Sequence, residues 1–210
     1  MFTSEARVHL HMNGIRYFFY FAFIDNLKSI LERGILPKNV VRRLQLKHRS
    51  FAEESVQARR QGREIQTSTG RHCSVHDMIP VYMNSQTPTL YARRKWQSEF
   101  VIFRIPIERA LLSDTEFAFC DGNAGDHDSG VYCHPSDLAK LDFEIIRARS
   151  WSGYPDGRRK RNAEFLLASI PLEAVDALIV DREASGERVR DVTARSGFHI
   201  RVIVDRAYFF

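Results

Sequence analysis

One stretch near the amino terminus limits the possible folds more than any other part of the chain. Residues 17–24 read YFFYFAFI, a run of large apolar side chains with no polar alternation. Because successive side chains in a strand point to opposite faces, this run predicts a strand that is buried on both faces. Asp25 follows as the expected N-cap of a helix, and Gly34 is expected to end that helix. The chain therefore needs a sheet whose central strand is covered on both sides.

The rest of the chain predicts short strands separated by few helices. Strands are expected over residues 78–83, 100–105, 116–119, 163–167, 177–180 and 198–204. Helices are expected over 50–63, 171–175 and 185–193, with a turn or short helix over 108–112 and a segment that becomes helical over 138–148; loops are expected over 66–76, 121–130 and 151–161. This mixture is typical of an α+β domain with a mostly antiparallel or mixed sheet. No repeat or Pro/Gly/Ser-rich linker divides the chain, so we expect one domain over residues 1–210.

The composition narrows the class of protein. Hydrophobic residues make up 44% and charged residues 27% of the chain, which is a globular balance and argues against disorder. No run of about 18 apolar residues is present, so no membrane-spanning helix is expected. Nor does the amino terminus have the pattern of a signal peptide. The three cysteines cannot all pair within one chain, which disfavours a secreted disulfide scaffold. We expect a soluble cytoplasmic protein.

The positive charge is carried mainly by arginine. The chain has 31 Lys and Arg against 26 Asp and Glu, and 25 of those 31 cations are Arg. Arginine grips phosphate through a planar fork and stacks on bases. An Arg-rich basic chain with many aromatic residues therefore favours a phosphorylated or nucleic-acid partner. Codon usage in a GC-rich genome is the alternative explanation.

A basic run leads directly to one carboxylate. Four consecutive cations precede Glu164, which begins an apolar strand; they are Arg158, Arg159, Lys160 and Arg161. Four like charges repel one another and favour a nearby anion, such as a nucleic-acid backbone or a pyrophosphate. A carboxylate at the strand edge would be held rigidly and would face whatever the basic loop gathers. The alternative is an ion pair between Glu164 and a neighbouring arginine, and a Glu164 sealed inside the core would contradict a catalytic role.

Aromatic residues and cations alternate in two further places. Arg59 and Arg60 close the basic segment that starts at residue 37, and Tyr82 and Tyr91 flank a turn. Further cations follow Tyr91; they include Arg93 and Arg94. Interleaved rings and cations suit single-stranded nucleic acid, because bases stack on the rings while the cations contact phosphates. Packing of the tyrosines against the core is the alternative.

Two other motifs do not predict a site. Residues 121–125 contain two glycines but match neither a P-loop nor a GxGxxG nucleotide fingerprint. His72, Cys73 and His76 make only part of a four-ligand zinc set, and the other cysteines lie far away in sequence. We therefore expect no metal.

Several blocks, taken in order, resemble the DarT family of toxins, which are ADP-ribosyltransferases of nucleic acids in toxin–antitoxin systems. The matching blocks are residues 24–34, 48–60, 76–91, 141–144 and 163–167. The resemblance implies an ADP-ribosyltransferase-like fold with a bent, split, mostly antiparallel β-sheet, flanking helices and a central cleft for NAD. It also implies transfer of ADP-ribose from NAD to thymine or guanine in single-stranded DNA. RNA as acceptor, nucleic-acid binding without catalysis, and NAD hydrolysis without an acceptor are the alternatives.

The resemblance also implies roles for individual residues. Glu164 matches the catalytic glutamate of the family, and Arg60 matches its essential arginine. Breaking the nicotinamide–ribose bond builds positive charge on the ribose, which a carboxylate stabilises, while an arginine pairs with the pyrophosphate. Residues 42–71 correspond to the segment that covers NAD. Further NAD contacts are expected from Tyr20, Ala22, Asn26, Tyr82 and Tyr91.

The chain departs from the family pattern before residue 24. Tyr20 stands where the family has a histidine that anchors the NAD ribose, and Ala22 stands at a threonine position. A tyrosine still offers a hydroxyl, so the change implies a divergent subfamily, a different nucleobase or weaker NAD binding. The expected partners are single-stranded DNA, NAD and a possible macrodomain antitoxin that removes the modification, with no membrane.

Overall fold

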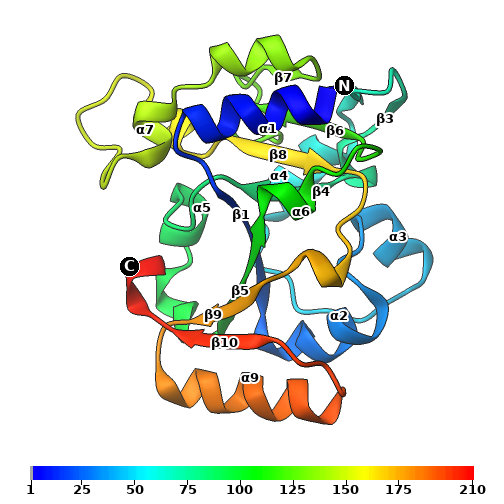
Figure 1. Ribbon diagram of the computed structural model, residues 1–210, viewed down its shortest axis with the longest axis vertical. Helices are drawn as coiled ribbons and strands as arrows, with labels where there is room; N and C mark the ends of the chain where they lie inside the picture. The colour runs from blue at the N-terminus through cyan, green and yellow to red at the C-terminus, as the bar shows by residue number, and fades with distance from the viewer. Residues whose placement is uncertain (1) are drawn as a thin grey trace.

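The computed structural model describes residues 2–210, and an eight-stranded sheet forms its centre (Figure 1). The strand order is β10-β9-β5-β1-β4-β8-β6-β7, and every neighbouring pair is antiparallel except β10 with β9. The strands are β1 (Tyr17–Phe23), β4 (Ile79–Tyr82), β5 (Phe100–Pro106), β6 (Phe117–Cys120), β7 (Val131–Tyr132), β8 (Glu164–Leu167), β9 (Ala177–Val180) and β10 (Arg201–Val204). The α+β prediction with a mostly antiparallel sheet is confirmed.

The sheet is split beside its central strand. β1 pairs with β5 along its whole length, but it meets β4 only where Phe19 lies opposite Tyr82. Two hydrophobic clusters bury β1 from opposite sides, with Phe18 in one and Phe21 in the other. The prediction of a strand covered on both faces is therefore confirmed, and the weak β1–β4 junction leaves room for side chains from both halves.

Helices surround the two halves of the sheet. They are α1 (Phe2–Met12), α2 (Leu27–Arg33), α3 (Lys38–Arg43), α4 (Glu54–Gln61), α5 (Pro88–Tyr91), α6 (Ile107–Ala110), α7 (Phe143–Arg147), α8 (Gly157–Arg161) and α9 (Glu183–Arg195). Figure 1 shows α1 and α7 beside the β8–β6 half, and α9 below β10 at the opposite end. A separate hairpin, β2 (Glu64–Gln66) with β3 (His72–Ser74), follows α4. Among residues 2–210, no helix is long and apolar enough to span a bilayer.

Several predicted elements differ from the structure in their ends or type. Gly34 ends α2 with a φ of 89°, as predicted, because a left-handed residue without a Cβ costs little there. Asp25 is not a helix N-cap: it lies inside the 3-10 helix η1 (Ile24–Asn26), and its carboxylate pairs with Arg49 and Arg188. The loop predicted over 66–76 is wrong, because β3 and the 3-10 helix η2 (Val75–Asp77) occupy much of it. The loop predicted over 151–161 contains α8.

Candidate active site

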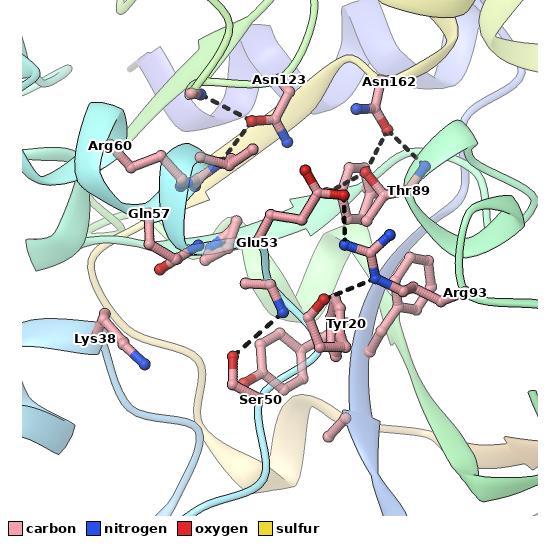
Figure 2. A pocket seen from close by; sticks show the side chains of 18 of the residues that line it. Tyr20, Lys38, Ser50, Glu53, Gln57, Arg60, Thr89, Arg93, Asn123 and Asn162 are labelled. Carbon is pink, nitrogen blue, oxygen red and sulfur yellow. Dashed lines mark hydrogen bonds and ion pairs between the residues drawn. The ribbon is translucent and has the colours of Figure 1, made fainter. Parts of the chain in front are cut away.

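A cavity of about 950 Å³ opens beside the junction of β1 and β4 (Figure 2). Both strands contribute to its wall, together with α4 and the loop that follows β6. Another wall is the segment that joins α3 to α4, which we call the strap (residues 46–53). The cavity therefore gathers residues that are far apart in sequence, at the place where the sheet is split.

A buried ion pair lies beside this cavity, with Arg60 in the cavity wall and Glu164 behind it. Glu164 is the first residue of β8, with its Cα opposite Tyr82 of β4 and Cys120 of β6. Its Oε1 accepts a hydrogen bond from Arg60 Nη1 at 2.7 Å and another from the Ala124 backbone N–H. Arg60, on α4, lines the cavity and is only 5% exposed. Burial lowers the pKa of Arg60, but the charge and hydrogen bond of Glu164, together with Tyr82 and Cys120, raise it, and the net shift is upward, so Arg60 is charged.

The carboxylate lies one side chain away from the cavity. Glu164 is 0% exposed, and its Oε2 is buried with no hydrogen-bond partner among residues 2–210. Glu164 does pair with an arginine, but the alternative of a surface ion pair with a neighbouring arginine is not what is found, because the partner is Arg60, 104 residues away, and the pair is buried. The expectation that Glu164 faces an open cleft is wrong for this conformation, because the Arg60 guanidinium stands between them. Direct contact between Glu164 and a substrate requires Arg60 to move.

One tyrosine, one threonine and two asparagines line the cavity beside the ion pair. Tyr82 lines the cavity, stacks on Phe21 at 5.1 Å and donates its hydroxyl to Thr89. Burial raises the pKa of Tyr82, and the nearby Glu164 carboxylate raises it further, so this hydroxyl stays protonated. Asn123 accepts from Arg60 Nη1 at 3.3 Å, and Asn162 accepts from the Thr89 hydroxyl at 2.9 Å (Figure 2). Sequence reasoning missed Thr89 and both asparagines, because isolated amides and hydroxyls carry no spacing signal.

The β1 wall has the residues that depart from the family pattern. Tyr20 and Ala22 both line the cavity. Burial raises the pKa of Tyr20 to about 12, so its hydroxyl is a hydrogen-bond donor throughout the physiological range. The Tyr20 ring packs edge-on against Phe103 at 5.8 Å, which fixes its direction.

Comparison with known protein families identifies the family of this chain. A family model described as ssDNA thymidine ADP-ribosyltransferase, DarT, matches residues 19–210. The chain belongs to this family. Its activity is therefore NAD-dependent ADP-ribosylation of single-stranded DNA, as the resemblance implied, and the RNA and non-catalytic alternatives find no support in the match.

Relatives and solved structures agree with the family assignment. A DNA ADP-ribosyl transferase of Thermus sp. (strain 2.9) is 29% identical over 180 residues, which cover 81% of this chain and 84% of that protein. A Thermosipho africanus fusion of a DNA ADP-ribosyl transferase with a DNA ADP-ribosyl glycohydrolase is 23% identical and covers 93% of this chain but 50% of the fusion. The structure of Thermus sp. 2.9 DarT with ADP-ribosylated ssDNA superposes with a TM-score of 0.83 at 24% identity, covering 94% of this chain and 97% of that one. The DarT fold expected from the sequence is confirmed.

Two residues expected to contact NAD in a DarT-like site are placed differently. Asn26 lines the cavity, but its amide donates to the Arg49 carbonyl at 2.7 Å and accepts from the Arg49 N–H at 2.8 Å. It therefore holds the strap. Tyr91 does not line the cavity: it is 42% exposed, with Arg94 above its ring at 4.2 Å. The prediction that these two residues bind NAD receives no direct support from this geometry.

The basic residues expected to bind DNA divide into bonded and free groups. Arg59 donates to the Gly125 carbonyl at 2.7 Å, and Arg93 bonds the Phe51 carbonyl and the Glu53 carboxylate at 2.8 and 3.0 Å. Both nevertheless line the cavity. Arg158 also lines it, is exposed, and forms no ion pair among residues 2–210. Arg158 is thus free to contact an acceptor, whereas Arg94, which is also exposed and has no carboxylate partner among residues 2–210, donates to the Tyr91 carbonyl at 3.1 Å and lies outside the cavity wall.

The remainder of the run at 158–161 is neutralised or buried. Arg159 pairs with Asp121 at 2.9 Å, and Lys160 pairs with Asp142 at 3.1 Å. Arg161 is 2% exposed and donates to three backbone carbonyls, those of Gln86, Ile145 and Ile146. Burial lowers the pKa of Arg161 to about 10. The prediction that Arg161 contacts nucleic acid is wrong, because its guanidinium is buried and donates to backbone carbonyls inside the protein.

The structure also addresses the partial zinc pattern. Among residues 2–210, no group of three His, Cys, Asp or Glu side chains is close enough to hold a metal ion. His72 lies on β3, whereas His76 lies on η2 and lines the cavity. His76 and Arg60 therefore line the same cavity.

Proposed function

We propose that this DarT-family protein transfers ADP-ribose to a thymine base of single-stranded DNA, with Arg60 and Glu164 as its catalytic pair. The observation that carries the proposal is the burial of this pair beside the cavity. Among residues 2–210 it is the ion pair in which both side chains are less than a tenth exposed. The thymine acceptor follows from the family, which is that of the ssDNA thymidine ADP-ribosyltransferases.

The chemistry assigns a different task to each member of the pair. The glycosidic bond breaks, its electron pair leaves with neutral nicotinamide, and positive charge builds on the ribose carbon. A base nitrogen then bonds to that carbon and must lose its proton. Glu164 Oε2 has no partner, so it is the oxygen available to stabilise the ribose cation or to take the proton.

Arg60 must move for this chemistry to proceed. Its guanidinium covers Glu164, and a substrate that carries phosphates offers it a second anion. In the proposal, Arg60 rotates toward the bound donor and uncovers the carboxylate. The Glu164 carboxylate is then exposed only when NAD is bound. In the free enzyme its buried negative charge stays paired with Arg60.

The test follows single-turnover transfer onto a short oligonucleotide with one thymine, and mass spectrometry locates the added ADP-ribose. Glu164→Gln keeps the shape and removes the negative charge, so we expect transfer to fall at least about 100-fold. The double variant Arg60→Gln/Glu164→Gln leaves no unpaired buried charge, and an unchanged melting temperature in this inactive variant would show that loss of activity is not loss of fold. Asp176→Asn is the matched control, because it breaks an ion pair with Arg104 of 2.8 Å that lies outside the cavity wall.

Two further measurements separate the alternatives. Oligonucleotides with guanine in place of thymine, and matched RNA, define the acceptor. Nicotinamide release without an acceptor measures simple hydrolysis. Transfer by Glu164→Gln at the wild-type rate would remove Glu164 from the reaction, and transfer to guanine alone would overturn the thymine assignment.

We also propose a cytoplasmic location and a separate glycohydrolase partner. All three cysteines are free thiols in the structure, as is usual in a reducing compartment. The Thermosipho africanus relative joins a transferase and a glycohydrolase in one chain. Co-expression of this chain with such a glycohydrolase is expected to relieve growth inhibition; unchanged inhibition would argue against the partnership.

A further inference from the structure

His76 is a buried side chain without any internal partner. It is 2% exposed, it lines the cavity, and neither ring nitrogen has a hydrogen-bond partner among residues 2–210. Leaving a buried polar group unbonded costs about 1–3 kcal/mol. Buried polar groups in native proteins nearly always have a hydrogen-bond partner, so an unbonded one calls for an explanation, such as a role in the site or a bound water or ion.

The fold does not need the imidazole to hold its own backbone. Ser74 caps η2 by accepting from the His76 N–H, and Asp77 accepts from the Ser74 N–H at 3.0 Å. Asp77 also accepts from Asn39 on α3 at 2.7 Å, which joins η2 to that helix. The neighbours of His76 therefore fix its position, while its ring is left unbonded at the cavity wall.

The surroundings of this ring are cationic. Lys38 lines the same cavity, on the side of Gln57 and Arg60 in Figure 2. Its Nζ lies 2.9 Å from His48 Nε2, and it forms no ion pair with a carboxylate among residues 2–210. Arg42, on the same helix, bonds the neutral Gln61 side chain at 3.0 Å and also lacks a carboxylate.

These charges keep the imidazole neutral. Burial lowers the pKa of His76 to about 4, and Arg42, Arg60 and Lys38 lower it further, against an opposing effect of Asp77. A neutral ring has one N–H that donates and one nitrogen that accepts. The neutral His76 ring can donate a hydrogen bond to an oxyanion, and the nearby cations Lys38 and Arg42, which have no carboxylate partner, attract its negative charge.

We propose that Lys38 and His76 form a subsite for the diphosphate of the nucleotide donor. The inference rests on the proposed transfer from NAD. In that donor the diphosphate is one sugar ring away from the bond that breaks, so its subsite is expected next to the catalytic pair. Arg60 meets this condition, because it contacts Glu164 and its charge also acts on His76. Both residues are binding residues in this proposal.

The experiment measures binding without catalysis. Isothermal titration is performed with ADP-ribose and ADP, which carry the diphosphate, and with adenosine, which lacks it. We expect His76→Leu and Lys38→Met each to weaken ADP-ribose and ADP by at least 10-fold and to leave adenosine within 2-fold. His199→Leu is the matched control, because His199 is exposed and lies outside the cavity wall.

A stability measurement separates ligand binding from a structural role. Because the imidazole has no partner to lose, His76→Leu is expected to unfold at the wild-type temperature or above it. His76→Gln keeps hydrogen-bonding groups and is expected to recover part of the affinity. A lowered melting temperature with equal weakening of adenosine would instead indicate a packing role and would overturn the subsite.

The remaining outcomes distinguish this subsite from the proposed function. Wild-type protein that binds neither NAD nor ADP-ribose would contradict both. Wild-type protein that binds ADP-ribose tightly, with folded His76→Leu and Lys38→Met binding it equally well, would overturn the subsite alone. Loss of transfer in Glu164→Gln with unchanged ADP-ribose binding would keep the two assignments separate.

Discussion

The two basic regions of this protein differ in what neutralises them. The run at 158–161 has the highest local charge in the sequence, yet Arg159 and Lys160 have carboxylate partners and Arg161 is used inside the protein. Lys38 and Arg42 are dispersed in the longer basic segment that starts at residue 37, yet neither has a carboxylate partner among residues 2–210. Density of charge along a chain therefore says little about which cations are free to meet a ligand.

The largest expected difference is in the free energy of unfolding, between variants at Arg161 and at Arg158. Arg161→Met leaves three backbone carbonyls without their donor and is expected to lower the free energy of unfolding by at least about 3 kcal/mol. Arg158→Met, three residues away on the exposed side, is expected to change it by less than about 0.5 kcal/mol. Urea denaturation of both variants measures the difference. Equal stability of the two would mean that Arg161 is not the structural member of the run.

The buried imidazole gives the second prediction, on pH. The pKa of His76 is about 4 in the folded protein and near 6.5 in the unfolded chain. Between these values the unfolded chain binds more protons, so the free energy of unfolding falls as the pH drops from 6.5 to 4. The contribution of this group is about 3 kcal/mol over that window. Urea titrations across the window should show a correspondingly shallower pH dependence in His76→Leu; parallel curves would contradict it.

Sequence reasoning found the central strand and the Arg60–Glu164 pair, for different reasons. The run at 17–24 has no polar residue to accommodate, so burial on both faces was the direct physical conclusion. The basic run before Glu164 singled out that carboxylate, but the role of Arg60 came only from the resemblance, since 104 residues separate the two and no local spacing links them. The geometry of the pair could not be predicted, because it depends on β8 pairing with β4 and on Arg60 of α4 reaching Glu164.

Other parts could not be predicted because tertiary contacts decide them. Asp25 has the residue type of a helix cap, but two arginines from distant segments compete for its carboxylate. Asn26 was expected to meet NAD, and its amide is used by the Arg49 backbone instead. In each case the residue type correctly predicts a hydrogen-bonding side chain, but the sequence does not show which group it bonds.

The strap gives the third prediction. Asn26→Ala removes two hydrogen bonds to Arg49, which also pairs with Asp25 and Glu99 and lies over the Phe23 ring at 3.9 Å. We expect a local loss of about 1–2 kcal/mol, seen as faster hydrogen exchange over residues 46–53. Exchange in β5 serves as the internal control and should stay unchanged. Uniformly faster exchange would indicate global rather than local destabilisation.

The smallest expected effect belongs to the one free cation of the run. Arg158 lines the cavity mouth without an ion pair, so Arg158→Met should weaken oligonucleotide binding mainly by removing one phosphate contact. The slope of the logarithm of affinity against the logarithm of salt concentration should then fall by about 0.7 for a single strand. Arg159→Met, whose guanidinium is occupied by Asp121, should change the slope less. Equal slopes for both variants and the wild type would mean that the basic run contributes nothing to DNA binding, and that the acceptor is held by other walls of the cavity.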